Sequence, residues 1–144
     1  MSQHFTILVG SVLGAAEYVA DALSDTLKAK QHEVSIQLDP DLEAIDQDST
    51  WIICTSTHGA GDLPDNIQPF AAQLEGQDLS AVNAYIIGLG DSSYDTFCHG
   101  AMTMEKLLTA ANATILAEPF HIDVLNHPIP EDEAVAWLDR TVTV

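Results

Sequence analysis

Residues 50–66 read TWIICTSTHGAGDLPDN, and they decide the fold. The run Trp51–Cys54 is apolar throughout and lacks the alternation of a strand with one wet face. Such a run is typical of a strand buried on both faces of a parallel sheet. The chain then changes to small polar residues and two glycines, and a proline predicts a helix over about 64–74. We therefore expect a central strand over about 50–55, ending in a loop where open α/β sheets bind ligands.

The rest of the chain repeats this alternation of strand and helix. Further strands are expected over 5–9, 33–38 and 84–89 and in a last region over 113–117 and 120–122, and further helices over about 15–30, over about 96–111 and from 130 onward. This alternation predicts one α/β domain over 1–144, a doubly wound five-stranded parallel sheet with helices on both faces. Five strands suit the order 2-1-3-4-5, in which the strand over 33–38 lies at an edge.

The net charge narrows the choice of partners. The chain carries 22 Asp and Glu residues against four Lys and Arg, which gives a formal charge of −18. A surface this acidic repels nucleic acid and anionic membranes, and it attracts basic proteins. Solubility, or adaptation to salt or cold, is an alternative reason for the same charge.

The N-terminus and the cysteines indicate the compartment. The first residues lead directly into a strand, without the basic and long apolar regions of a secretory signal. Cys54 and Cys98 form no CxxC pair, so we expect reduced thiols. These features predict a cytoplasmic protein, and we expect a monomer.

The first loop, residues 10–16, has the features of a phosphate cradle. Gly10 and Gly14 permit a tight turn, and the amides of residues 12–16 would face inward at a helix N-terminus. Ser11 offers a hydroxyl, and no Lys or Arg lies nearby. The loop has neither the Walker motif nor the GxGxxG fingerprint. An ordinary strand-to-helix turn remains an alternative.

Three segments together resemble a known family. GSVLGAAEYVA (10–20), STHGAGDLPDN (56–66) and GLGDSSYDTFCHGA (88–101) are similar, in order and spacing, to the three FMN-binding loops of flavodoxins. The resemblance covers nearly the whole chain and is strongest to the MioC-type short flavodoxins, with the FMN domains of diflavin reductases as relatives. It implies a flavodoxin-like fold and FMN as cofactor.

The resemblance also implies the residues of the site. The phosphate would be held by Ser11, Val12, Leu13, Gly14, Ala15 and Ala16, and the flavin ring would be bordered by Ser56, Thr57, His58, Gly59, Ala60 and Gly61 on one side and by Gly90, Asp91, Tyr94, Phe97 and Cys98 on the other.

Particular side chains in these loops are open to more than one interpretation. Tyr94 would stack on the ring, or it is a surface tyrosine that caps a helix. Many relatives have Thr in place of Leu13 and Ala15, so fewer hydroxyls would reach the phosphate here. His58 stands where relatives have Trp or Tyr, and it packs on the ring or leaves that face open.

The resemblance implies an electron carrier without catalytic residues. Electrons would come from a basic, NADPH-dependent flavoprotein reductase and pass to a biosynthetic metalloenzyme, in biotin synthesis for MioC-type proteins. An alternative is a stand-alone FMN-dependent NAD(P)H or quinone reductase. A signalling receiver domain shares the strand order, but Thr55 and Ser56 stand where its acceptor Asp would be. We expect no metal site, because His121, Asp123 and His127 have no recognisable ligand spacing.

Overall fold

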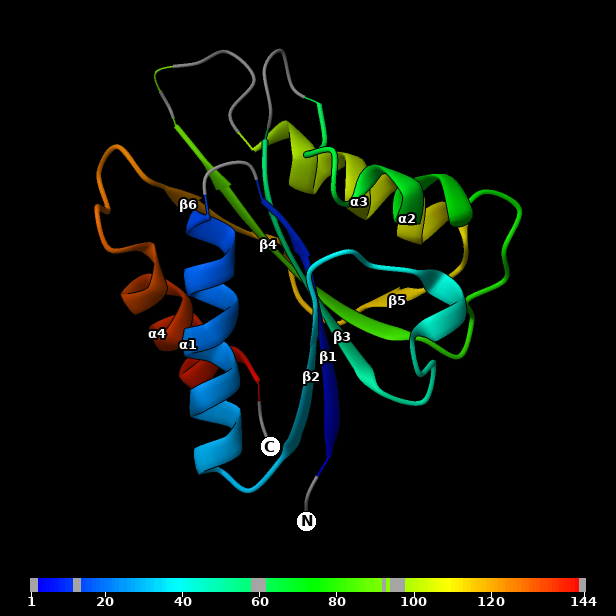
Figure 1. The fold of residues 1–144 in the computed structure, drawn as a ribbon, viewed down its shortest axis with the longest axis horizontal. Coiled ribbons are helices and arrows are strands. Elements are labelled where there is room, and N and C mark those ends of the chain that lie inside the picture. The colour runs from blue at the N-terminus through cyan, green and yellow to red at the C-terminus, as the bar shows by residue number, and fades with distance from the viewer. Residues whose placement is uncertain (1–2, 12–13, 58–61, 92, 94–97, 143–144) are drawn as a thin grey trace.

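A computed structural model describes residues 3–11, 14–57, 62–91, 93 and 98–142 (Figure 1). The strands are β1 (His4–Gly10), β2 (Glu33–Gln37), β3 (Thr50–Ser56), β4 (Asn83–Gly90), β5 (Thr114–Ile115) and β6 (Phe120–Asp123). The α-helices are α1 (Ala15–Ala29), α2 (Gln68–Gln73), α3 (His99–Ala110) and α4 (Pro130–Thr141), and a 3-10 turn, η1, covers Leu42–Ala44. None of the described helices has both the length and the apolar character needed to cross a bilayer.

The strands form one parallel sheet in the expected order. The path is β2-β1-β3-β4-β5, and β6 also pairs with β4. The last strand of the predicted five-stranded sheet is therefore two short pieces along one edge of β4. β2 lies at the opposite edge, as its alternating sequence predicts.

Helices cover both faces of the sheet. α1 and α4 lie on one face, and α2 and α3 lie on the other (Figure 1). The side chains of Trp51 and Ile53 pack into the core under α2 and α3, whereas Ile52 and Cys54 pack under α1 and α4. All four are fully buried. The unbroken apolar run of β3 thus has a direct cause, since the strand fills two cores.

Two helix starts differ from the sequence prediction. α2 begins at Gln68 rather than near Pro64, because residues 65–67 form a turn in which the Ile67 N–H donates to the Pro64 carbonyl at 3.1 Å. Pro69, and not Pro64, occupies the first turn of the helix. α3 begins at His99 rather than near Thr96, because Cys98 has a φ of 54°, which a right-handed helix does not accept.

Candidate functional site

Three connections start from the same edge of the sheet. In a parallel sheet the carboxyl ends of β1, β3 and β4 lie side by side, and here Gly10 is opposite Thr55, which is opposite Gly88. A Cβ on Gly10 would overlap the Thr55 Oγ1 and would lie 2.9 Å from the Ile67 side chain. Glycine is therefore needed at this point for the first loop to leave β1 beside β3.

Ser11 and Gly14 shape the first loop around the N-terminus of α1. The Gly14 N–H donates to the Ser11 Oγ at 2.9 Å, so in this structure that amide is used within the loop. Gly14 has a φ of 90°, a left-handed conformation that disfavours other residues. Ala15 and Ala16 form the first turn of α1, where backbone N–H groups have no partner inside the helix. The Ser11 hydroxyl hydrogen and this helix end are together suited to an anion.

Asn66 connects the first two loops, although no local pattern in the sequence predicts a role for it. Its Oδ1 accepts a hydrogen bond from the Ser11 N–H at 2.9 Å. Its Nδ2 donates to the carbonyl oxygens of Val9 at 2.7 Å and Leu38 at 2.6 Å. The signal in the sequence was an Asn two residues after Pro64, at a place where a turn amide is common.

The second loop is linked to α3. The Thr57 Oγ1 accepts a hydrogen bond from the Gly100 N–H at 3.0 Å. A Cβ on Gly100 would lie 2.6 Å from the Ser56 carbonyl oxygen, so the first turn of α3 touches the end of β3 backbone to backbone. The described part of this loop, Ser56 and Thr57, therefore borders the start of the helix that follows the third loop.

The third loop leaves β4 through an aspartate turn. The Asp91 carboxylate accepts hydrogen bonds from the Ser93 N–H at 2.8 Å and from the Ser93 hydroxyl at 2.6 Å. The Gly90 carbonyl accepts from the Val124 N–H at 2.8 Å, which joins the end of β4 to the segment after β6. Asp91 is half-buried at this edge.

Cys98 is buried rather than displayed at the edge. Its exposed fraction is 0%, and its Sγ lies against the position that a Cβ on Gly88 would take. Burial and, to a lesser extent, the nearby Asp123 carboxylate raise the pKa of the Cys98 thiol to about 12, although a hydrogen bond with the Ile122 backbone acts in the opposite direction. A thiol in this state fills space and does not act as a nucleophile at neutral pH.

Eight of the expected site residues lie outside the described residues. They are Val12, Leu13, His58, Gly59, Ala60, Gly61, Tyr94 and Phe97. Their roles stay predictions, including the stacking of Tyr94 and the placement of His58.

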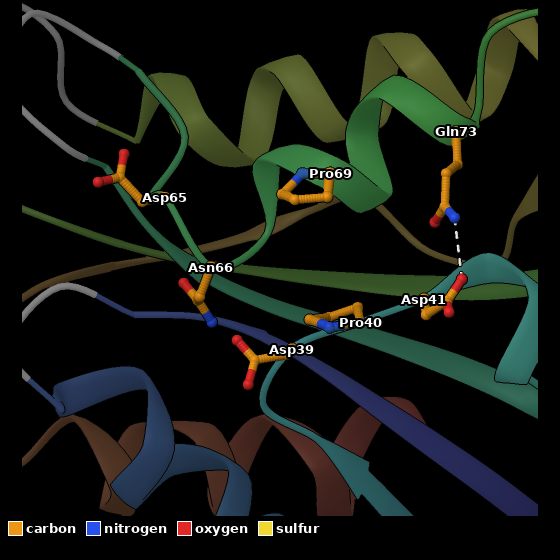
Figure 2. A pocket seen from close by; sticks show the side chains of 7 residues that line it. All are labelled: Asp39, Pro40, Asp41, Asp65, Asn66, Pro69 and Gln73. Carbon is orange, nitrogen blue, oxygen red and sulfur yellow. Dashed lines mark hydrogen bonds between the residues drawn. The ribbon is translucent and has the colours of Figure 1, made fainter.

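An acidic pocket lies next to Asn66. It has a volume of about 330 Å³ and is lined by Asp39, Pro40, Asp41, Asp65, Asn66, Pro69 and Gln73 (Figure 2). The Gln73 side chain donates to the Asp41 carboxylate at 2.9 Å. This pocket adds negative charge beside the first loop, and its lining residues include no cation.

Within the described part of the chain, no group of three His, Cys, Asp or Glu side chains is arranged as metal ligands. Asp123 accepts hydrogen bonds from the Leu125 N–H at 3.1 Å and from the Asn126 amide at 2.7 Å, which closes the turn after β6.

The described donors fit the phosphate end of a flavin nucleotide. A phosphate needs several hydrogen-bond donors and a favourable potential, and the Ser11 hydroxyl with the α1 N-terminus supplies both without a basic side chain. Gly90, Asp91 and Thr57 lie at the same sheet edge, where the ring of a bound flavin would follow. The described residues therefore fit such a cofactor.

Comparisons with known proteins agree with this geometry. The family model for flavodoxin matches residues 7–137. A Haemophilus influenzae protein named MioC homolog is 43% identical over 137 residues, which cover 94% of each chain. Protein MioC of Escherichia coli K12 is 41% identical over 141 residues, or 96% of each chain. The solved structure of a cysteine-to-serine mutant of flavodoxin from Pseudomonas aeruginosa superposes with a TM-score of 0.83 at 32% identity, covering 96% of this chain and 95% of that one. The chain therefore belongs to the flavodoxin family, among its short MioC-type members.

Proposed function

We propose that this protein is an FMN-binding electron carrier. The observation that carries the proposal is the Ser11–Gly14 turn at the N-terminus of α1, in a chain that matches the flavodoxin family from residue 7 to residue 137. Bound FMN would supply the one-electron chemistry. The protein contributes the donors that hold the phosphate and the acidic surroundings of the ring.

Carboxylates at this edge of the sheet would lower the reduction potential of a bound flavin. Asp91 is half-buried at the end of β4, and Asp62 and Asp65 are exposed in the connection after β3. Carboxylates near a flavin disfavour its negatively charged reduced form, and so they lower the potential at which that form appears. A low potential suits a protein that delivers electrons.

The placement of the basic residues supports a basic partner. Lys28 lies in the last turn of α1, and Lys30 follows the end of that helix. Arg140 lies at the end of α4, and Lys106 lies in the second half of α3. These helices run opposite to the parallel strands, so the four cations lie away from the carboxyl edge that carries the three loops. The edge with the cofactor would therefore face a basic surface first.

From this we propose the physiological role. A basic, NADPH-dependent flavoprotein reductase would reduce the protein, and a biosynthetic metalloenzyme would accept its electrons, in biotin synthesis by its likeness to MioC. The protein would act as a monomer in the cytoplasm.

The visible spectrum of the purified protein tests the cofactor. We expect flavin absorption, or its appearance after FMN is added to the colourless protein, with bands shifted from those of free FMN. A protein that stays colourless with excess FMN would refute the proposal.

Salt dependence tests the partner. Electron exchange with a basic reductase should slow as salt increases, because screening shortens the range of charge attraction to about 8–10 Å at moderate ionic strength. A rate that is independent of salt would assign the −18 charge to solubility.

The alternative function is a flavin-dependent NAD(P)H or quinone reductase. A single 144-residue domain leaves little material for a nicotinamide pocket. Steady oxidation of NADPH by the isolated, FMN-loaded protein would favour this enzyme over the carrier.

A further inference from the structure

The side chain of Asn66 makes three hydrogen bonds to three separate segments. It accepts from the Ser11 N–H and donates to the carbonyls of Val9 and Leu38. The reverse orientation of the carboxamide would place its oxygen against two carbonyls and its NH₂ against an N–H, so the contacts settle the orientation. Figure 2 shows this side chain pointing from the connection between β3 and α2 toward β1.

These bonds lead directly to the first loop. Val9 is the second-last residue of β1, and Ser11 is the first residue after it. The Ser11 Oγ in turn accepts from the Gly14 N–H, and the Gly14 carbonyl accepts from the Tyr18 N–H at 3.1 Å in the first turn of α1. A continuous series of hydrogen bonds thus runs from Asn66 through Ser11 and Gly14 to α1.

These hydrogen bonds determine which donors of the first loop remain available to an anion. The Ser11 N–H is used by Asn66, and the Gly14 N–H is used by the Ser11 Oγ. A hydroxyl that accepts one hydrogen bond still has its own hydrogen to donate. The position of the Ser11 hydroxyl depends on the orientation of the Ser11 backbone, which is held by the hydrogen bond from the Ser11 N–H to Asn66.

We propose that Asn66 is the positioning residue for the phosphate end of the cofactor, and that it determines the preference for a phosphorylated flavin over one without phosphate. This inference rests on the proposed function. Asn66 would not itself touch the phosphate. It acts through Ser11, and it ties the connection that begins at Thr57 to the loop that follows β1.

The test compares FMN with riboflavin, which has the same ring and no phosphate. Asn66→Asp keeps the shape of the side chain but places a carboxylate against two carbonyls, and Asn66→Ala removes all three bonds. We expect FMN to bind about tenfold to a hundredfold more weakly in both variants, the value of one hydrogen bond to a charged phosphate. Riboflavin binding should change less than about threefold, within the usual spread for a site whose ring contacts are intact.

Gln68→Ala is the matched control. Gln68 is the first residue of α2, two positions after Asn66. Its amide donates to the Leu63 carbonyl at 2.8 Å, and its described bonds reach neither β1 nor Ser11. This variant should keep the FMN preference of the parent chain.

The outcomes separate the inference from the function on which it rests. A parent chain that binds no FMN would refute the proposed function, and the inference with it. Equal losses of FMN and riboflavin in the Asn66 variants, with a parent that prefers FMN, would overturn the inference alone and leave Asn66 a purely structural residue.

A second measurement needs no variant. Amide hydrogen exchange on the parent chain without flavin should show a protected Ser11 N–H, because its hydrogen is bonded to Asn66 before any ligand binds. Rapid exchange of this amide would overturn the proposal even if the Asn66 variants fail to fold.

Discussion

The contact between β4 and α3 permits a sharp test of how the third loop is held. Gly88 of β4 faces Ala101 of α3, and a Cβ on Gly88 would lie 2.5 Å from the Ala101 Cβ. Carbon atoms in contact prefer about 3.5–4.0 Å, so Gly88→Ala forces the helix outward by about 1 Å. Cys98 also lies close to this position, with its Sγ at 3.5 Å from the same Cβ.

The magnitude follows from packing. Gly88→Ala should lower the free energy of unfolding by about 1–3 kcal/mol, the usual cost of overpacking a core. Ala101→Gly should lower it by about 1.5–2 kcal/mol, from about 0.8 for a buried methyl and about 1 for glycine in a helix. In the double variant the strand carries the methyl that the helix has lost. The double variant should therefore lose only about 1 kcal/mol, the cost of the helix glycine, which is less than the loss in Ala101→Gly alone.

The assay is urea unfolding at 25 °C, monitored by the fluorescence of Trp51 and Trp137. A single domain of this size permits a two-state analysis of the unfolding curve. The variants should rank in FMN affinity as they rank in stability, because α3 begins directly after the third loop. A double variant whose loss equals the sum of the two single losses would refute the reasoning, as would a Gly88→Ala variant as stable as the parent.

Three further outcomes are expected. Gly100→Ala should cost about 1–3 kcal/mol in unfolding free energy, because its Cβ would meet the Ser56 carbonyl at 2.6 Å and no flexible side chain can yield; an unchanged urea midpoint would contradict this. The pKa of both Cys54 and Cys98 is raised to about 12, chiefly by burial. At pH 8 a thiol reagent should therefore react about a thousandfold more slowly with the folded chain than with the chain in denaturant. Fast labelling of the native protein would contradict this expectation. Burial lowers the pKa of His121 below its ordinary 6.5, although the carboxylates of Glu105 and Glu118 act in the opposite direction. As the pH falls, the unfolded chain therefore binds a proton on this imidazole at a higher pH than the folded chain does. The stability of the parent relative to His121→Gln should therefore be constant above about pH 7.5 and fall as the pH drops through 6.5, and a difference independent of pH would exclude this role.

Local patterns in the sequence were sufficient for the architecture. The unbroken apolar run of β3 predicted a strand buried on both faces, and the structure places Trp51 and Ile52 in the cores on opposite faces of the sheet. Alternation of strand and helix predicted the parallel order, because right-handed crossovers leave few other arrangements. Once the sheet is parallel, the loops after β1, β3 and β4 must meet at one edge.

The tertiary structure alone decided how those loops are held. Asn66 and Ser11 are 55 residues apart, and Thr57 and Gly100 are 43 apart, so no local pattern relates them. The observed starts of α2 and α3 differ from the predicted ones for the same reason. Residues 65–67 stay a turn, with the Asn66 amide on carbonyls of β1 and of the segment after β2, and Cys98 has a left-handed φ where α3 packs against β3. Local propensity describes one segment at a time, whereas these contacts depend on which groups the completed sheet brings within hydrogen-bonding distance.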